Sequence, residues 1–139
     1  MRKRMRVLLA MVLALLFAAS AAFAADSFMV LKDPKGGSYL ADSGGMALYS
    51  LKNDLPGMSI CSGACATNWP HFYAPKPVIP KGLDPKDFDS MFRDDNSPQT
   101  TFRRMPLYHY SGDKNKGDLN GKAFPKNWST VDPATFRKK

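Results

Sequence analysis

The 139-residue sequence contains no glutamate, and its twelve acidic residues are all aspartate. It has only two histidines and two cysteines. Paired glutamates and the His-Glu-x-x-His zinc motif are therefore excluded, and the Gly-x-Ser-x-Gly turn of serine hydrolases is also absent. The Cys-x-x-Cys-His motif of covalent haem attachment is absent as well. We therefore expect no enzymatic activity and no bound cofactor.

Long apolar runs are also absent except at the beginning of the chain, where one extends from Val7 to Phe23 with a single serine in it. Four Arg and Lys residues precede the run, and Ala22-Phe23-Ala24 ends it. This order of segments is typical of a secretory signal. An uncleaved membrane anchor is the alternative, but the run is short for a bilayer span. We predict a cleavable signal peptide at residues 1–24 and a periplasmic or secreted mature protein without a membrane span.

The mature chain has little excess charge of either sign. Four of the 20 Lys and Arg residues lie in the predicted signal, so residues 25–139 carry a net charge of +4. A charge this small, without a basic helix, does not support nucleic-acid binding. We expect a monomer with an unidentified envelope partner or ligand.

Residues 25–139 have the size of a single domain, and Gly- and Pro-rich turns divide them into short segments. Long amphipathic helices are hard to find, which favours an all-β fold with mainly antiparallel strands. One or two helical turns are expected within residues 61–69, and Pro70 ends them. Strands are expected at residues 28–32, 38–42, 46–51, 88–93, 99–110 and 128–131.

The chain contains a weak internal repeat with an offset of 59 residues. Met46-Ala47-Leu48-Tyr49 aligns with Met105-Pro106-Leu107-Tyr108, and the same offset pairs Asp54 with Asp113 and Trp69 with Trp128. Each strand-loop-Trp unit is too small to bury its own apolar face. We therefore expect the two units to pack against each other as one core, with both tryptophans buried.

Several motifs occur in the order found in a known family. Tyr108, Tyr110 and Asp113 match a Yx(FWY)xxD pattern, and the segment from Tyr49 to Asp54 matches it except for Leu51 in the aromatic place. A Cys-x-x-x-Cys and an Asn-Trp-Pro follow the first copy, at residues 61–65 and 68–70. In these features the chain resembles the bacterial secreted-repeat family of predicted lipoproteins. The resemblance implies an exported domain of no agreed activity.

The sequence departs from that family pattern in three places. His71 stands where a second proline is usual, and Arg104 stands where glycine is usual. Many relatives resemble lipoproteins, whereas no cysteine lies at the predicted cleavage site of this chain. We therefore expect a soluble domain without a lipid anchor.

The cysteine pair allows two interpretations. An exported protein meets an oxidising compartment, so Cys61 and Cys65 are expected to form a disulfide. Alternatively, Met58, Cys61, Cys65 and His71 form a soft ligand set suited to Cu(I). The leading functional hypothesis is thus a non-enzymatic binding or scaffolding domain of the envelope, and the alternative is a periplasmic redox or copper-handling protein.

Overall fold

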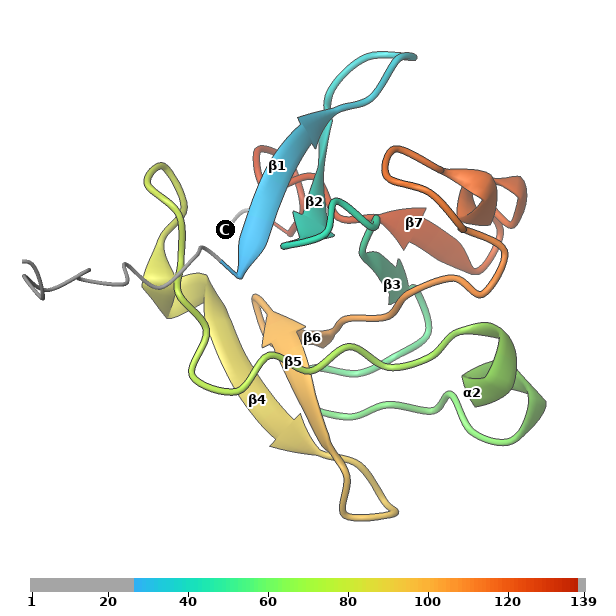
Figure 1. The fold of residues 1–139 in the computed structure, drawn as a ribbon. Helices are drawn as coiled ribbons and strands as arrows, with labels where there is room; N and C mark the ends of the chain where they lie inside the picture. The colour runs from blue at the N-terminus through green and yellow to red at the C-terminus, as the bar shows by residue number, and fades with distance from the viewer. Residues whose placement is uncertain (1–26, 138–139) are drawn as a thin grey trace, which may run out of the picture.

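The structure is a computed structural model that describes residues 27–137. Antiparallel strands dominate it in three small sheets, β1–β2, β4–β5–β6 and β3–β7 (Figure 1). The all-β prediction is confirmed. The strands are β1 (Phe28–Lys32), β2 (Ser38–Asp42), β3 (Tyr49–Leu51), β4 (Phe88–Phe92), β5 (Pro98–Phe102), β6 (Met105–Pro106) and β7 (Trp128–Thr130); the helical elements are α2 (Ala64–Asn68), η1 (Pro85–Asp87) and η2 (Asn120–Ala123).

Each repeat begins with the same hairpin. β1 pairs with β2 and β4 pairs with β5, and each pair of strands is joined by five residues, 33–37 and 93–97. These hairpins correspond at an offset of 60 residues, whereas the later parts of the repeats correspond at 59. The difference lies in the next turn, which is one residue longer in the first repeat. The offset of 59 found in the sequence therefore holds only from this turn onward.

The predicted single strand over residues 99–110 is wrong. β5 ends at Phe102, and the chain reverses through Arg103 and Arg104 before β6 pairs back onto β5. Both arginines have positive φ, 46° and 68°, a conformation that no strand residue adopts. Arg104 occupies the place that Gly45, with φ of 81°, takes in the first repeat. Arg104 thus keeps the left-handed backbone that glycine adopts at the equivalent position of the first repeat.

The third expected strand is also shorter than predicted. Residues 46–51 were expected to be extended, but β3 covers only Tyr49–Leu51, with one isolated antiparallel bridge between Ala47 and Ala41. The strand is short because Tyr49 leaves its own hairpin to pair with the second repeat. β3 consequently lies beside β7 from the far end of the chain (Figure 1).

The end of each repeat pairs with the hairpin of the other repeat. Val131, which ends the second repeat, donates its N–H to Leu48 O (3.3 Å) and accepts from Leu40 N (2.7 Å) in the first. At the equivalent place Phe72, which ends the first repeat, bonds in the same way to the second repeat, to Leu107 O (2.9 Å) and Thr100 N (2.8 Å). The repeats are therefore interlocked, and each lacks a backbone partner without the other.

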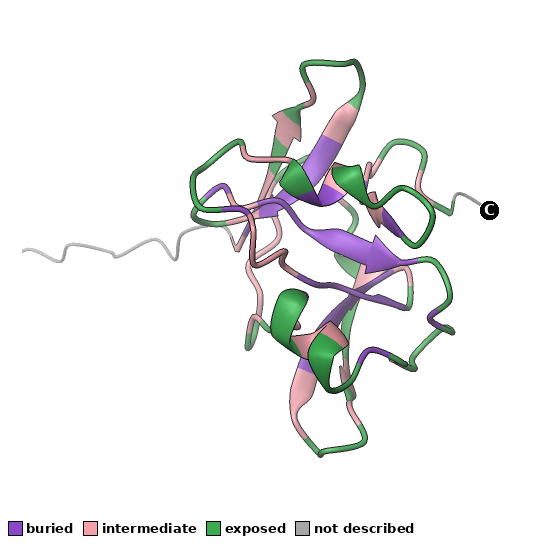
Figure 2. Ribbon diagram, turned by 90° about the vertical axis from the view of Figure 1, so that its right-hand side faces the viewer, coloured by how far each residue is buried: buried purple, intermediate pink, exposed green. Residues whose placement is uncertain are grey.

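Two buried clusters form the core, and each draws side chains from both repeats. One is mainly aromatic, with Tyr49, Trp69, Tyr108 and Trp128 among its members. The other is mainly aliphatic and phenylalanine-rich, and includes Leu48. Buried segments occupy the centre of the molecule and exposed loops its periphery (Figure 2). Within residues 27–137 no helix is long and apolar enough to cross a membrane; the predicted signal at 1–24 lies outside the described residues.

Candidate functional site

Tyr49 and Tyr108 lie side by side where the two repeats meet. Each donates its backbone N–H to the carbonyl of the other, at 2.8 Å from Tyr49 N and 3.0 Å from Tyr108 N. Both side chains are fully buried. Because the two residues are equivalent in the repeats, this bridge is the centre of the internal symmetry. The site is built outward from it.

The two tyrosine hydroxyls form crossed hydrogen bonds to aspartates of the opposite repeat. Tyr108 Oη donates to Asp54 Oδ2 at 2.5 Å, and Tyr49 Oη donates to Asp113 Oδ2 at 2.6 Å. The second oxygen of each carboxylate accepts a backbone N–H at 2.8 Å, from Ile60 in one loop and from residue 120 in the other. Charge-assisted bonds of this kind are about twice as strong as neutral ones. The tyrosine and the aspartate of the repeated motif therefore join the two units.

Burial dominates the electrostatics of this site. It raises the pKa of Asp54 above the ordinary 3.8, although the bonds from Ile60 N and Tyr108 oppose the rise. Burial, together with the hydrogen bond to the neighbouring carboxylate, also raises the pKa of Tyr108 and of Tyr49 well above 10.0. The phenols therefore keep their protons near neutral pH and act as donors.

The tryptophans complete the aromatic cluster, as the repeat predicted. Both are 6% exposed, and their rings stack with centroids 3.8 Å apart and an interplanar angle of 8°. Tyr49 packs edge-on against Trp69 (5.3 Å), and Tyr108 packs edge-on against Trp128 (5.1 Å). The half-buried Tyr110 lies on the outer side of Trp69, with centroids 4.4 Å apart. The aromatic contacts within each repeat are thus joined by the tryptophan stack between them.

Gly121 is required by close approach in this cluster. A Cβ at this position would lie 2.5 Å from a Tyr49 ring carbon and 3.0 Å from Trp69, closer than side chains can approach. Its N–H also donates to Tyr49 Oη, at 3.3 Å. The sequence shows a glycine in a loop here and gives no sign of this contact.

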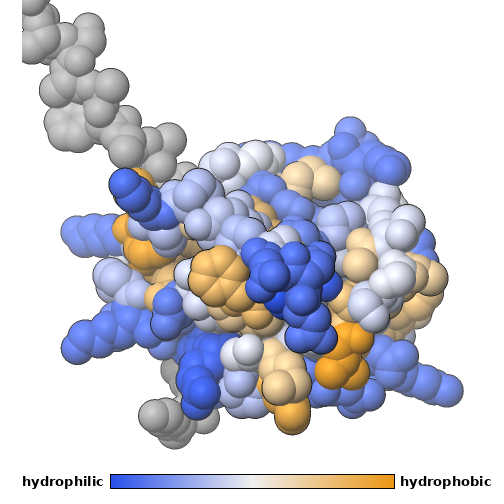
Figure 3. All heavy atoms as spheres, turned by 90° about the horizontal axis from the view of Figure 1, so that it is seen from below, coloured by the Kyte–Doolittle hydropathy of each residue, from blue (hydrophilic) through white to orange (hydrophobic). Residues whose placement is uncertain are grey.

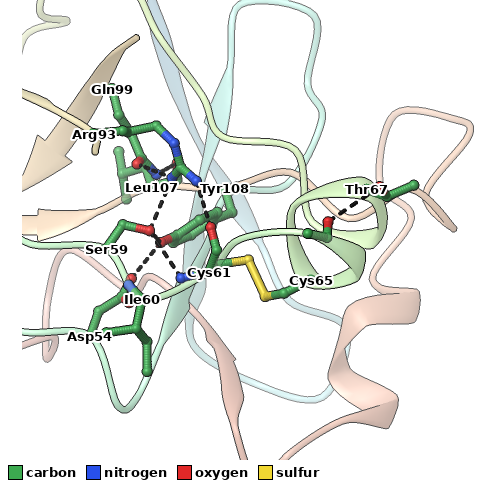
Figure 4. The surroundings of a disulfide bond; sticks show 11 residues. Asp54, Ser59, Ile60, Cys61, Cys65, Thr67, Arg93, Gln99, Leu107 and Tyr108 are labelled. Carbon is green, nitrogen blue, oxygen red and sulfur yellow. Dashed lines mark hydrogen bonds between the residues drawn. A yellow bond between two sulfur atoms is a disulfide. The ribbon is translucent and has the colours of Figure 1, made fainter. Parts of the chain in front are cut away.

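The predicted disulfide is present between Cys61 and Cys65. Cys61 is buried, and its carbonyl accepts a hydrogen bond from Arg93 Nη2 at 2.5 Å. Arg93 Nη1 also donates to Ser59 Oγ (3.0 Å) and to Gln99 Oε1 (2.7 Å), so the guanidinium joins the disulfide loop to β5 (Figure 4). Ser59 in turn shares a 2.6 Å hydrogen bond with the hydroxyl of Tyr108. The disulfide loop, the arginine and the tyrosine site are therefore one network.

Sequence analysis missed Arg93 and Gln99 in this network. Arg93 occupies the place of Asp33 in the first repeat and stands in a turn rich in acidic and polar residues, where an arginine is usually exposed. Sequence analysis also missed the pair between His109 Nε2 and Asp42 Oδ2 (2.8 Å), which joins the second repeat to the end of β2. Partners this distant in sequence leave no periodic signal, so only the fold reveals them.

In the structure, the residues of the predicted copper site are not available together as metal ligands. Both cysteine sulfurs are bonded to each other and offer no thiolates. Met58 is more than half exposed on a tight turn, and His71, partly buried, pairs through its backbone with Tyr108. α2 ends at Asn68, two residues before Pro70, whose carbonyl accepts the His109 N–H at 2.8 Å. A soft ligand set would thus require reduction of the disulfide, and copper binding stays a prediction.

The duplication seen in these contacts is also found when the chain is compared with known protein families. A family model described as a secreted repeat of unknown function matches it twice, over residues 30–72 and 90–132. The chain belongs to this family. The two matched secreted repeats coincide with the interlocked units described above. Comparison with curated proteins and with solved structures gave no match.

Proposed function

We propose that this secreted-repeat protein is a non-enzymatic scaffold of the bacterial periplasm or cell surface, exported by its N-terminal signal and working by binding. One observation carries the proposal: the polar groups of the repeated motif are used between the repeats. Tyr108 bonds to Asp54 and Tyr49 bonds to Asp113, all four residues being buried. Groups held in this way stabilise the fold and are not exposed to bind or attack a substrate.

The motif's role can be measured through stability. Removing a group that holds the fold together lowers the free energy of unfolding. Replacing a residue that is under functional strain often leaves the stability unchanged or raises it. We expect Tyr49→Phe and Asp113→Asn each to destabilise the mature protein in urea unfolding. Unchanged or higher stability in both variants would argue that the motif is catalytic or ligand-binding, as would turnover of generic ester, peptide or glycan substrates.

An exposed turn at residues 55–60 is suited to contact with a partner protein. Leu55 and Met58 exchange backbone hydrogen bonds of 3.2 and 2.9 Å, which places their side chains on one face of a tight turn. Ile60 follows two residues later, and all three side chains are more than half exposed. Figure 3 shows that apolar patches on the lower face of the molecule are separated by strongly hydrophilic side chains.

A hollow of about 150 Å³ adjoins this turn. Residues 59–62 line one side of it and Arg93, Asp94 and Asp95 line the other. Apolar anchors beside a hollow, with a rim of both charge signs, are the usual anatomy of a protein–protein interface. We therefore propose that the partner is an envelope protein that contacts the 55–60 turn.

Site-specific photo-crosslinking in the native envelope tests this contact. A photoreactive residue at position 60 should give a discrete protein adduct, which is lost when Leu55→Asp is added. The matched control is position 35, in the exposed turn between β1 and β2. Adducts of equal yield from both positions, or lipid adducts alone from position 60, would contradict a protein partner at this turn.

Copper handling remains the second candidate from the sequence, and it requires the reduced form. Stoichiometric Cu(I) uptake by the reduced protein that is lost in Cys65→Ser would favour it over the scaffold. No uptake after reduction would exclude it.

A further inference from the structure

Four aromatic rings form a continuous path through the centre of the molecule. Its order is Tyr49, Trp69, Trp128 and Tyr108, with successive ring centroids 5.3, 3.8 and 5.1 Å apart. The two central indoles are parallel within 8° and are almost fully buried. Indole and phenol are the side chains most readily oxidised by one electron. The path therefore places one phenol at each end of an indole pair.

The stacked indoles suit the loss of an electron. A face-to-face pair at 3.8 Å allows the positive charge of an oxidised indole to spread over both rings. Two further aromatic rings connect the pair with the surface. Tyr110, half-buried, lies 4.4 Å from Trp69, and the partly exposed Phe124 packs edge-on against the same ring.

Each terminal phenol has a proton acceptor in place. A phenol is oxidised at moderate potential only if its proton leaves with the electron, which requires a base within hydrogen-bond reach. Tyr108 Oη lies 2.5 Å from Asp54 Oδ2, and Tyr49 Oη lies 2.6 Å from an Asp113 oxygen. Tyr110 has no such bond to a carboxylate in the described part of the chain, so it serves as the internal comparison.

We propose that the path from Tyr49 to Tyr108 is a site of one-electron oxidation, at which the protein takes up an oxidising equivalent from a small diffusible radical. The radical, of the azidyl or carbonate class, gains one electron from the indole pair and becomes azide or carbonate, which leaves one radical cation shared by the two indoles. The oxidised indole then takes one electron from Tyr108, and the phenol proton passes to Asp54. The products are a neutral tyrosyl radical, a protonated carboxyl and a restored indole. Tyr49 and Asp113 form the equivalent pair at the other end.

This site goes beyond the proposed scaffold role and does not depend on it. In an oxidising compartment the path would confine a radical to the buried core of the molecule. The exposed apolar side chains of the 55–60 turn and the Cys61–Cys65 disulfide lie outside the four-ring path. Binding by the turn can therefore fail while the oxidation site stands, and the reverse also holds.

Pulse radiolysis of the folded mature protein with azidyl radicals tests the proposal. We expect the tryptophanyl absorption to decay as the tyrosyl absorption grows, at one first-order rate that is independent of protein concentration. The double variant Tyr49→Phe/Tyr108→Phe should lose this growth and keep a long-lived tryptophanyl radical. The matched control Tyr110→Phe should keep the growth at the wild-type rate.

Proton transfer is tested separately. Asp54→Asn/Asp113→Asn should lose the tyrosyl growth because an amide cannot take the proton. If either double variant does not fold, the wild-type protein is measured in heavy water, where coupled proton transfer should slow the growth of the tyrosyl absorption. A rate unchanged in heavy water, a tyrosyl radical that disappears only in Tyr110→Phe, or no tyrosyl radical at all would overturn the proposal.

Discussion

The substitution Tyr108→Phe examines the crossed hydrogen bonds with the least change of shape. The phenyl ring keeps its edge-on contact with Trp128, and only the hydroxyl is removed. Asp54 loses its 2.5 Å donor and keeps one bond, from the backbone N–H of Ile60. Ser59 Oγ also loses its 2.6 Å partner, although it still accepts from the guanidinium beside it.

The size of the effect follows from this count of lost bonds. A hydrogen bond to a charged group contributes about 1.5–3 kcal/mol, and a neutral one contributes about 1 kcal/mol. The carboxylate of Asp54 stays buried with one donor fewer, so the loss is not relieved by water. We expect Tyr108→Phe to lower the free energy of unfolding by about 2–4 kcal/mol. Tyr49→Phe should cost a similar amount because its bond to Asp113 is equivalent to the bond between Tyr108 and Asp54.

Urea unfolding followed by tryptophan fluorescence measures this change. The control is Tyr110→Phe, which removes a hydroxyl that bonds to no group within residues 27–137 and should cost less than about 0.5 kcal/mol. A double-mutant cycle of Tyr108→Phe with Asp54→Asn should show a coupling of about 1–3 kcal/mol. A coupling near zero, or equal effects of Tyr108→Phe and Tyr110→Phe, would refute the role assigned to the crossed pair.

Three further predictions concern other parts of the core. Trp69→Ala and Trp128→Ala should each lower the free energy of unfolding by about 3–5 kcal/mol, and wild-type thermal stability in either would contradict the stacked core. Reduction of the Cys61–Cys65 bond should lower the free energy of unfolding by about 2 kcal/mol in the chain-entropy model. The change is measured as the shift of the urea midpoint when a reductant is added. No shift would show that the loop is held by its other contacts. Although burial opposes ionisation, hydrogen bonds from an imidazole and two backbone N–H groups hold the pKa of Asp42 below 3.8. Its folded-state pKa is lowered, so its contribution is present above pH 3.8 and is lost as the pH falls through the folded value. The acid-induced loss of thermal stability should accordingly be shallower in Asp42→Asn, and an unchanged profile would contradict this assignment.

Local signals predicted much of the fold. Strands at 28–32 and 38–42 and the helical turn before Pro70 follow from short apolar segments between Gly- and Pro-rich turns. The repeat also predicted that Trp69 and Trp128 are equivalent buried residues. These features depend on neighbours in the chain, which the sequence shows directly.

The missed features depend on residues distant in the chain or on an unusual backbone. The turn at Arg103 and Arg104 escaped prediction because arginines rarely adopt positive φ, whereas a glycine there would have marked it. An internal repeat in the sequence shows that two units are alike. It does not show whether the strands of each unit pair within that unit or with the other unit. The exchange of Phe72 and Val131 between the repeats is therefore visible only in the structure.

The interlocking of the two repeats is tested most directly by cutting the chain between them while it is folded. Lys81 and Gly82 lie in an exposed turn between the repeats, where a specific protease site can be inserted. After cleavage we expect both halves to elute together as one folded species and to separate only in denaturant. Two halves that separate under native conditions, each retaining its own fold, would contradict the interlocked core.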